Sequence, residues 1–329
     1  AFFLTRALPG DPARMLLGPQ ARPADVARAR QIYGLDRPMG EQYVLFWTKL
    51  VHRGPASTGA EPHGSDAHSH ASCAQLPLGI HLDLGHSFRY RRPVVDLLLD
   101  KAPRSIELAV AGLLLQVLIG LGVGIVSARW RGTLVDQLSI GATLVGVSAP
   151  TFLLGLILQY VLAHQLRWLP FDGYGTTPAE HLQSLVLPAL TLGIFGAALY
   201  ARLCRDELAS VLRADYVRTA RAKGASELRV LVVHGLRTAL IPVATLLVLD
   251  FGTLVGGAVV TERLFRWPGV GNMAVDALIN RDGPVVLGTV LFSATAIVLA
   301  TLLLDVLYAV LDPRLRRRGD PSTSGAPAD

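Results

Sequence analysis

The sequence is poor in charge and in cysteine. Charged residues make up 17% of its 329 residues and hydrophobic residues 51%, whereas ordinary soluble proteins have about 25% and about 45–50%. Soluble domains of this total length would need more charged surface, so the composition disfavours a purely soluble fold. The two cysteines, Cys73 and Cys204, are too few to staple a small secreted scaffold.

The apolar residues are concentrated in runs that are long enough to cross a membrane. A spanning helix needs about 20 mostly apolar residues, because the hydrocarbon core is ~30 Å thick. Five segments meet this requirement: 105–127, 138–163, 185–203, 239–261 and 285–311. Buried soluble helices do not account for five such runs in one chain. The sequence therefore predicts an all-α integral membrane protein.

The first eight residues suggest one more span. Residues 1–8 are largely apolar up to Pro9-Gly10-Asp11-Pro12, which terminates a helix strongly. We interpret 1–8 as the end of a first transmembrane helix that this sequence truncates, which makes six expected spans. A signal peptide is disfavoured because a basic start, a long apolar core and a small-residue cleavage site are absent.

The distribution of Lys and Arg predicts the orientation. The loops and tail on one side of the predicted membrane carry 13 Lys and Arg residues, and the short loops on the other side carry 4. Because cytoplasmic loops are the basic ones, we expect loop 206–239 inside and residues 9–104 outside. Cys73 and Cys204 then lie on opposite faces and cannot pair. The net charge of +6 thus reflects topology, and no binding to nucleic acid is expected.

The predicted organisation follows from these spans. The extracytoplasmic region 9–104 contains a flexible insert at about 53–78, rich in Gly, Ser, Ala, Pro and His. Residues 105–311 form the transmembrane core, and 312–329 form a basic, disordered cytoplasmic tail. Within the core, the spaced glycines of Gly120/Gly124 and Gly252/Gly256 predict close approach between spans.

The cytoplasmic loop 206–239 is the most informative segment. Residues 215–224 read Asp-Tyr-Val-Arg-Thr-Ala-Arg-Ala-Lys-Gly, a helix-forming stretch that Gly224 should end. Ser226 can cap a second short helix directly afterwards. Two short helices with a glycine break predict a knob outside the bilayer. From spacing alone, an amphipathic interfacial loop is an equal alternative.

This loop resembles the cytoplasmic coupling motif of ABC importer permeases. Ala220 and Gly224 match the spaced Ala and Gly of that signature, and Leu236 matches its later Leu. Arg218 stands where the general signature has Glu, and Arg237 where it has Pro. In both departures the loop is similar to the dipeptide and oligopeptide branch of the family, to which nickel permeases also belong.

Other stretches resemble the same branch in their order and spacing. The proline of that branch comes slightly later, here as Pro242. The other matching stretches are Leu8–Pro12, Tyr33–Pro38, Asp83–Ser87, Gly146–Pro150, Gly256–Glu262, Trp267–Gly271 and Leu311–Arg314. The resemblance covers nearly the whole chain except about 53–78 and the tail.

The resemblance implies a permease subunit of an ATP-driven ABC importer that translocates peptides across the cytoplasmic (inner) membrane of a bacterium or archaeon. The implied partners are a second homologous permease subunit, two ABC ATPase subunits, an extracytoplasmic substrate-binding protein and membrane lipid. The chain would not be an enzyme and would bind no cofactor itself, because ATP and Mg²⁺ would be held by the ATPase subunits.

The lysines agree with that division of labour. A P-loop needs a Lys followed by Ser or Thr after a glycine-rich turn. Lys49, Lys101 and Lys223 are followed by Leu, Ala and Gly, so ATP hydrolysis is expected on separate subunits. The resemblance implies that the knob forms the ATPase-coupling contact, with its basic side chains facing the ATPase. The residues expected there are Asp215, Arg218, Ala220, Arg221, Lys223, Gly224, Ser226 and Glu227.

Four ionisable residues fall within the predicted spans, where charge is costly. Glu107 and Arg202 lie near span ends, and we expect them to snorkel to the interface. Asp305 is expected to pair with a neighbouring helix or loop. Asp250 lies mid-span and is the better pathway candidate. It could attract the amino terminus of a substrate or hydrogen-bond a partner helix, and the sequence leaves both alternatives open.

The insert contains potential metal ligands but no apolar residues to fix a coordination geometry. They are His63, Asp66, His68, His70 and Cys73. Nickel permeases belong to the same branch, so a nickel-binding role is an alternative. We expect weak adventitious binding or none, and we predict no designed metal site.

Three other functions are weighed against peptide import. One is a nickel or other small-solute ABC permease, since substrate specificity resides largely in the binding protein. Dipeptides, longer peptides, nickel chelates and glutathione all stay open. Another is an ion-coupled secondary transporter with Asp250 as its coupling carboxylate. An intramembrane enzyme is disfavoured, because His164, at the edge of span 138–163, has no evident serine partner.

Overall fold

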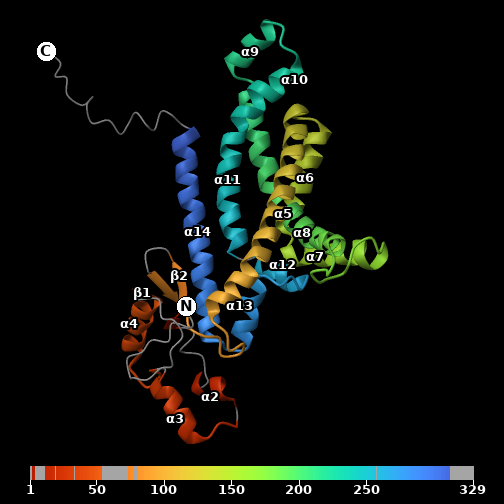
Figure 1. Ribbon diagram of the computed structural model, residues 1–329. Helices are drawn as coiled ribbons and strands as arrows, with labels where there is room; N and C mark the ends of the chain where they lie inside the picture. The colour runs from red at the N-terminus through yellow and green to blue at the C-terminus, as the bar shows by residue number, and fades with distance from the viewer. Residues whose placement is uncertain are drawn as a thin grey trace, which may run out of the picture. The chain divides into compact units, whose positions relative to one another are not determined.

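The fold of the chain is helical (Figure 1). The computed structural model describes residues 2–3, 12–18, 20–32, 34–53, 73–76, 80–256 and 258–311. The described residues form two compact units. The first unit lies within Ala1–Ser105 and Pro268–Phe292, and the second within Ile106–Trp267 and from Ser293 onward. Helices α5 and α14 contribute residues to both units.

The first unit combines short helices with a small sheet. Its elements are α2 (Pro12–Leu17), α3 (Pro23–Ile32), α4 (Met39–Leu50), β1 (Val51–Arg53), β2 (Cys73–Leu76), β3 (Ile80–Asp83), the start of α5 (Val94–Arg129), α13 (Val270–Ile279) and the start of α14 (Gly283–Leu311). The strands pair antiparallel in the order β1-β3-β2. Val51 lies opposite Leu82, and Cys73 opposite Asp83. The sequence analysis does not predict this sheet, and β2 lies within the segment expected to be a flexible insert.

The core of the first unit joins segments that are far apart in the sequence. Val94, Leu97 and Leu98 of α5 pack with Val270 and Met273 of α13 in one buried cluster. Burying each large apolar side chain contributes about 1.5–3 kcal/mol. Of the predicted first span 1–8, only residues 2 and 3 are described. The tail 312–329 lies outside the described residues.

The second unit contains most of the long apolar helices and the loop 206–239. Its elements are the rest of α5, α6 (Leu134–Ser148), α7 (Thr151–Leu158), a π-helical segment (Gln159–Gln165), α8 (Pro178–Val211), α9 (Asp215–Ala222), α10 (Glu227–Arg229), a second π-helical segment (Val230–Leu236), α11 (Arg237–Val255), α12 (Val259–Leu264) and the rest of α14. Tyr200 and Cys204 of α8 pack with Leu113 of α5 and Val243 of α11 in its core.

Among the described residues, four helices are long and apolar enough to cross a membrane. They are Val94–Arg129, Pro178–Val211, Glu227–Val255 and Gly283–Leu304. They include the predicted spans 105–127 and 185–203 completely, and most of 239–261 and 285–311. The prediction of a helical integral membrane protein is confirmed, with the small sheet as an addition to it.

The predicted span 138–163 is wrong as a single helix. Helix α6 ends at Ser148, and α7 begins at Thr151. Between them Ala149 is extended (φ −78°, ψ 132°) and Pro150 has ψ 138°. Proline lacks the N–H that a helix interior requires and disfavours helical dihedrals at the preceding residue. The apolar run is therefore divided between two shorter helices.

The predicted span 239–261 also ends early. Helix α11 stops at Val255, and the separate helix α12 begins at Val259. The predicted close approaches between spans occur at the glycines. A Cβ atom on Gly120 of α5 would lie 2.4 Å from Tyr200 Cβ of α8, and one on Gly252 of α11 would lie 2.5 Å from Ala300 Cβ of α14. Only glycine allows these helices to pack so closely.

Candidate functional site

The loop 206–239, which we call the coupling loop after the role expected for it, folds into two short helices, as its sequence predicts. Helix α9 ends at Ala222, and Gly224 follows in the left-handed region with φ +83°. The Gly224 N–H donates to Arg221 O at 2.9 Å, and the Ala225 N–H donates to Ala220 O at 3.1 Å. A Cβ on Gly224 would have no atom within 4 Å. Backbone conformation, not space, thus requires glycine here.

The second helix of the loop starts at a polar cap and continues into the membrane. The Arg229 N–H donates to Ser226 Oγ at 3.4 Å, so Ser226 caps α10. Helix α10 is followed by the π-helical segment Val230–Leu236 and by α11 without a break. In Figure 1, α9 and α10 lie at the end of α11. The loop is therefore attached directly to a spanning helix.

A small buried core holds the two halves of the loop together. Val217 of α9 is 0% exposed and packs with Val211 and Val230, which are also buried. Leu212 and Ala225 pack partly buried against this cluster. The core joins the end of α8, α9 and the start of the π-helical segment. The loop therefore has a fixed shape.

An ion pair across the glycine turn adds to this core. Arg221 Nε lies 2.8 Å from Glu227 Oε1, and Arg221 Nη2 lies 3.3 Å from Glu227 Oε2. Arg221 Nη1 also donates to Leu212 O at 3.3 Å. The structure thus directs Arg221 toward the loop itself, whereas the sequence interpretation has it facing the ATPase. Arg218 points outward, 3.8 Å from the exposed Asp215.

Exposed apolar side chains on the loop were missed by the sequence analysis. Leu228 of α10 is 71% exposed, and Tyr216 of α9 is 50% exposed. They flank the turn at Gly224, and the polar residues Lys223 and Arg218 are exposed beside them. Apolar side chains presented by a rigid surface loop are suited to a protein partner. The sequence carries no signal for this, because the neighbouring Val217 is apolar too and is buried.

Near the loop, a buried ion pair joins α6 to α8. Arg205 Nε and Nη2 donate to the two carboxylate oxygens of Asp136 at 2.7 and 2.8 Å. The Gly132 N–H donates to Asp136 Oδ2 at 2.9 Å. These partners, chiefly the hydrogen bonds from Arg205, lower the pKa of Asp136 to about 2. Arg205 also contacts Asp206 at 2.8 Å. The two partners are 69 positions apart in the sequence, which leaves no sequence signal for this pair.

Asp250 hydrogen-bonds a neighbouring helix, which is one of the two roles left open by the sequence. The Tyr200 hydroxyl of α8 donates to Asp250 Oδ2 at 3.0 Å. Tyr200 is fully buried, whereas Asp250 is only half-buried. Among the described residues, Tyr200 is the one side chain that contacts this carboxylate. Oxygen Oδ1 is therefore available to a further partner.

The carboxylate of Glu107 is held by two other side chains, whereas the sequence analysis expects it only to snorkel to the membrane interface. Its carboxylate bonds His181 Nε2 through one oxygen and accepts from the Tyr174 hydroxyl at 3.3 Å through the other. His181 Nδ1 lies 2.8 Å from Tyr174 O. The ring of the buried Trp267 lies tilted against the rings of Tyr174 and His181, at centroid distances of 4.8 and 5.6 Å. Both partners of the imidazole are acceptors, which suits a doubly protonated ring. The cluster ties α5 to the start of α8.

Fewer contacts are described for the other charged residues of the predicted spans and for the predicted metal ligands. Arg202 is exposed, as snorkelling requires, and the side chain of Asp305 lies outside the described part. His63, His68 and His70 also lie outside it, and Cys73 begins β2. The described residues contain no group of three or more potential metal ligands.

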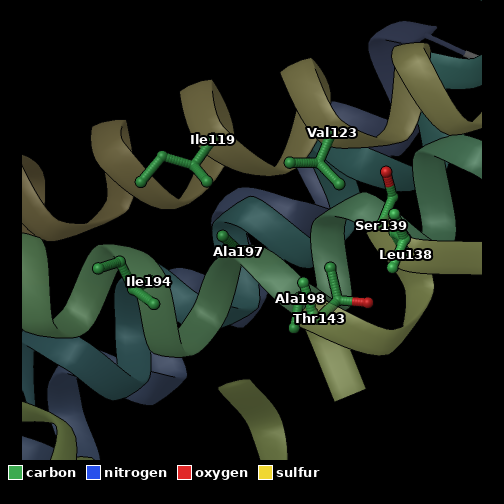
Figure 2. A pocket seen from close by; sticks show the side chains of 9 residues that line it. Ile119, Val123, Leu138, Ser139, Thr143, Ile194, Ala197 and Ala198 are labelled. Atoms are coloured by element: carbon green, nitrogen blue, oxygen red, sulfur yellow. The ribbon is translucent and has the colours of Figure 1, made fainter. Parts of the chain in front are cut away.

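An apolar cavity of about 400 Å³ lies between α5, α6 and α8. Figure 2 shows Ile119 and Val123 of α5 facing side chains of the other two helices. The remaining lining residues are Leu138, Ser139, Ala142, Thr143, Ile194, Ala197 and Ala198. None of these side chains is ionisable. The cavity can therefore hold an apolar group but offers no acid or base for chemistry.

Comparison with known proteins identifies relatives over nearly the whole chain. The glutathione transport system permease proteins GsiC of Salmonella paratyphi A (strain ATCC 9150 / SARB42) and Escherichia coli (strain K12) are each 37% identical over 315 residues. Each alignment covers 96% of this chain and 92% of the relative.

Solved structures of ABC transporters share the fold. One, described as inward-facing conformations of the MetNI methionine ABC transporter, has a TM-score of 0.56 at 16% identity and covers 67% of this chain and 98% of its own. A second, an amino acid ABC transporter with histidines, has a TM-score of 0.50 at 14% identity, covering 66% and 95%.

Two family models match the chain. The model for the inner membrane component of binding-protein-dependent transport systems matches residues 120–317, and the model for the N-terminal part of such components matches residues 1–109. Members of this family are membrane permeases without a nucleotide site of their own. The chain therefore belongs to the family of inner membrane components of binding-protein-dependent transport systems, as a multi-pass permease subunit of an ABC importer.

Proposed function

We propose that the chain imports short peptides, glutathione among them, as one of two homologous permease subunits. The observation that carries the substrate class is its 37% identity, over 96% of its length, to permeases named for glutathione transport. Two ATPase subunits supply ATP and Mg²⁺ chemistry on the cytoplasmic side. A substrate-binding protein delivers the peptide on the other side. The chain itself binds no cofactor.

The coupling loop is the proposed contact with an ATPase subunit. Its core at Val217 and the ion pair between Arg221 and Glu227 give it a fixed shape. Leu228 and Tyr216 present apolar surface beside the turn at Gly224. Because α10 continues into α11, a displacement of this loop is transmitted to a spanning helix. Rigid coupling of this kind suits an importer whose energy source lies on another subunit.

Asp250 is the proposed substrate contact within the membrane. A half-buried carboxylate at mid-span is costly against lipid, so its uncovered side is expected to face protein or a water-filled pathway. Tyr200 occupies oxygen Oδ2 and leaves Oδ1 for a cation. The α-ammonium group of a peptide has the complementary charge. Asp250 would thus both hydrogen-bond a neighbouring helix and attract the amino terminus of a substrate, because the bond to Tyr200 orients the carboxylate.

Transport by the reconstituted complex tests this function. The permease is placed in proteoliposomes with the partner subunits encoded beside its gene, and uptake of labelled glutathione, a dipeptide and a nickel–histidine chelate is measured. We expect ATP-dependent uptake of the peptides that survives collapse of proton and sodium gradients. Uptake of the nickel chelate alone would refute the peptide assignment. Uptake that needs an ion gradient and no ATP would refute ATP-driven import.

A further inference from the structure

Helix α4 of the first unit has apolar side chains on two neighbouring faces. Leu50 belongs to the buried cluster of that unit, and Phe46 packs against the cluster. A second group of apolar side chains on α4 is exposed, although three of them are large. We call this group the aromatic face of α4: Met39, Tyr43, Val44 and Trp47. Met39, Tyr43 and Trp47 recur at every fourth residue and therefore share one side of the helix.

The core side of α4 fixes the helix next to spanning helices. The buried cluster that contains Leu50 also contains residues of α5 and Val285 of α14. Leu291 and Phe292 of α14 pack against the same cluster. They lie within the predicted span 285–311, roughly 10 Å along the helix from its start at about 1.5 Å per residue. Helix α4 is therefore held close to one boundary of the hydrocarbon.

A second predicted span meets α4 at the aromatic face itself. The ring of Phe3 stacks on that of Tyr43 at a centroid distance of 5.4 Å, and the ring of Phe2 lies 5.5 Å from that of Phe46. Phe2 also contacts Tyr43 edge-on at 5.4 Å. These two phenylalanines belong to segment 1–8, the predicted end of a first transmembrane helix. The aromatic face is thus continuous with a segment that is expected to lie in lipid.

The other side of α4 is polar. Glu41 and Thr48 are exposed, and their spacing of seven residues puts them on one side of the helix, away from Tyr43 and Trp47. The helix contains one acidic and one basic residue, Glu41 and Lys49, so its own charges balance. Tyrosine and tryptophan are the residues enriched where a membrane meets water. A helix with a protein side, an apolar side and a polar side suits that boundary.

The geometry points to the aromatic face of α4 as an anchor that inserts into the membrane, in the leaflet on the side predicted to be extracytoplasmic. Its partner is the lipid surface, at the level where headgroups meet acyl chains. Apolar contact holds it there, because the balanced charges of α4 provide no attraction to anionic headgroups. The anchor keeps the first unit at the membrane surface, beside the ends of α5 and α14.

Quenching of Trp47 fluorescence tests the anchor. The complete complex is placed in nanodiscs, and the difference in emission between the unmodified complex and its Trp47→Phe variant isolates Trp47. We expect phosphatidylcholine with brominated acyl chains to quench the emission of Trp47 at least twofold, and aqueous iodide to have little effect. Brominated phosphatidylglycerol should quench to the same extent. The measurement needs neither substrate nor ATP, so its result is independent of the proposed function.

Two charged variants of the same helix provide the comparison. Val44→Asp places a carboxylate on the aromatic face, and we expect it to reduce quenching by brominated lipid at least twofold and to expose Trp47 to iodide. Thr48→Asp adds the same charge on the polar side of α4 and serves as the matched control. It should leave both kinds of quenching unchanged.

Three results would overturn the anchor. One is strong quenching of Trp47 by iodide with none by brominated lipid in the unmodified complex, a result that does not depend on how the variants fold. Another is an equal effect of Val44→Asp and Thr48→Asp. The third is protection of Trp47 from iodide only after the substrate-binding protein is added, which would assign the aromatic face to a protein partner.

Discussion

At the scale of single residues, three groups of charged side chains contact each other within the second unit. Asp136 and Arg205 form a two-bond fork, Arg221 and Glu227 form another, and Glu107 is held by His181 and Tyr174. Charges in or near a membrane are costly unless they are paired. Their pairing here joins neighbouring helices and the two halves of the loop 206–239.

Removing Asp136 should destabilise the second unit, because it leaves the Arg205 guanidinium without its buried partner. We expect Asp136→Ala to cost about 1–3 kcal/mol and to lower the melting temperature of the purified protein in detergent. Asp206→Ala removes the exposed partner of the same arginine and should have little effect. Equal effects of the two changes would contradict a special role for the buried pair.

The same pair should not make the stability of the fold depend on pH in the neutral range. Because the folded pKa of Asp136 is lowered to about 2, the pair stabilises the fold fully above the ordinary carboxyl pKa of about 4 and loses its effect as the pH falls toward 2. We expect the difference in melting temperature between the unmodified protein and Asp136→Ala to be constant from pH 5.5 to 8. A difference that shrinks within this range would contradict the lowered pKa.

The ion pair across the coupling turn should matter for coupling more than for folding. Glu227→Arg places two positive charges together and should reduce ATP-driven uptake several-fold. The exchanged pair, Arg221→Glu with Glu227→Arg, restores opposite charges and should recover much of the activity. Each variant is reconstituted in the complex. Its uptake is then measured, together with the ATP hydrolysis that the binding protein stimulates. Absence of any recovery would indicate that Arg221 or Glu227 contacts the ATPase directly.

At the scale of elements, the turn between α9 and α10 depends on one backbone conformation. Gly224→Val forces a β-branched residue to φ +83°, which is unfavourable by roughly 1–2 kcal/mol. We expect uptake and stimulated ATP hydrolysis to be lost while membrane insertion is unchanged. Gly18→Val is the matched control, since Gly18 also has a positive φ, +93°, and open space, in the turn after α2. Normal uptake by Gly224→Val would count heavily against the coupling assignment.

Sequence analysis predicts elements well where one property extends over many residues. Long apolar runs predict the spans of α5, α8 and α14, and Gly224 and Ser226 predict the two helices of the coupling loop. It fails where a single residue determines where a helix ends, as at Pro150, which divides an otherwise uniform apolar run. The strands β1 to β3 are three or four residues long, too short for a periodic signal.

The contacts of the candidate site were less predictable for a different reason. Asp136 and Arg205 are 69 residues apart, Glu107 and His181 are 74 residues apart, and only the packing of helices brings them together. The resemblance implies that Arg221 faces an ATPase subunit. In the structure its guanidinium also pairs with Glu227, a contact that the sequence analysis does not predict.

At the scale of the whole molecule, the pathway prediction concerns Asp250. Asp250→Asn removes the negative charge but keeps an acceptor for the Tyr200 hydroxyl. We expect the KM for peptides with a free amino terminus to rise several-fold, with little change for the same peptides acetylated at the amino terminus. Tyr200→Phe, which keeps the charge, should have the smaller effect on KM. An equal change for free and acetylated peptides would show that Asp250 has a structural role only.

The lengths of the spanning helices have a mechanical consequence. Helix α8 continues eight residues beyond the predicted span 185–203, and the helix that contains α11 begins twelve residues before 239. At about 1.5 Å per residue these extensions form a two-helix stalk of roughly 12–18 Å outside the hydrocarbon. A tilt of about 15° at its base would swing the tip by roughly 3–5 Å. The stalk is thus a lever arm, long enough to convert a small push from outside the lipid into a rotation within it.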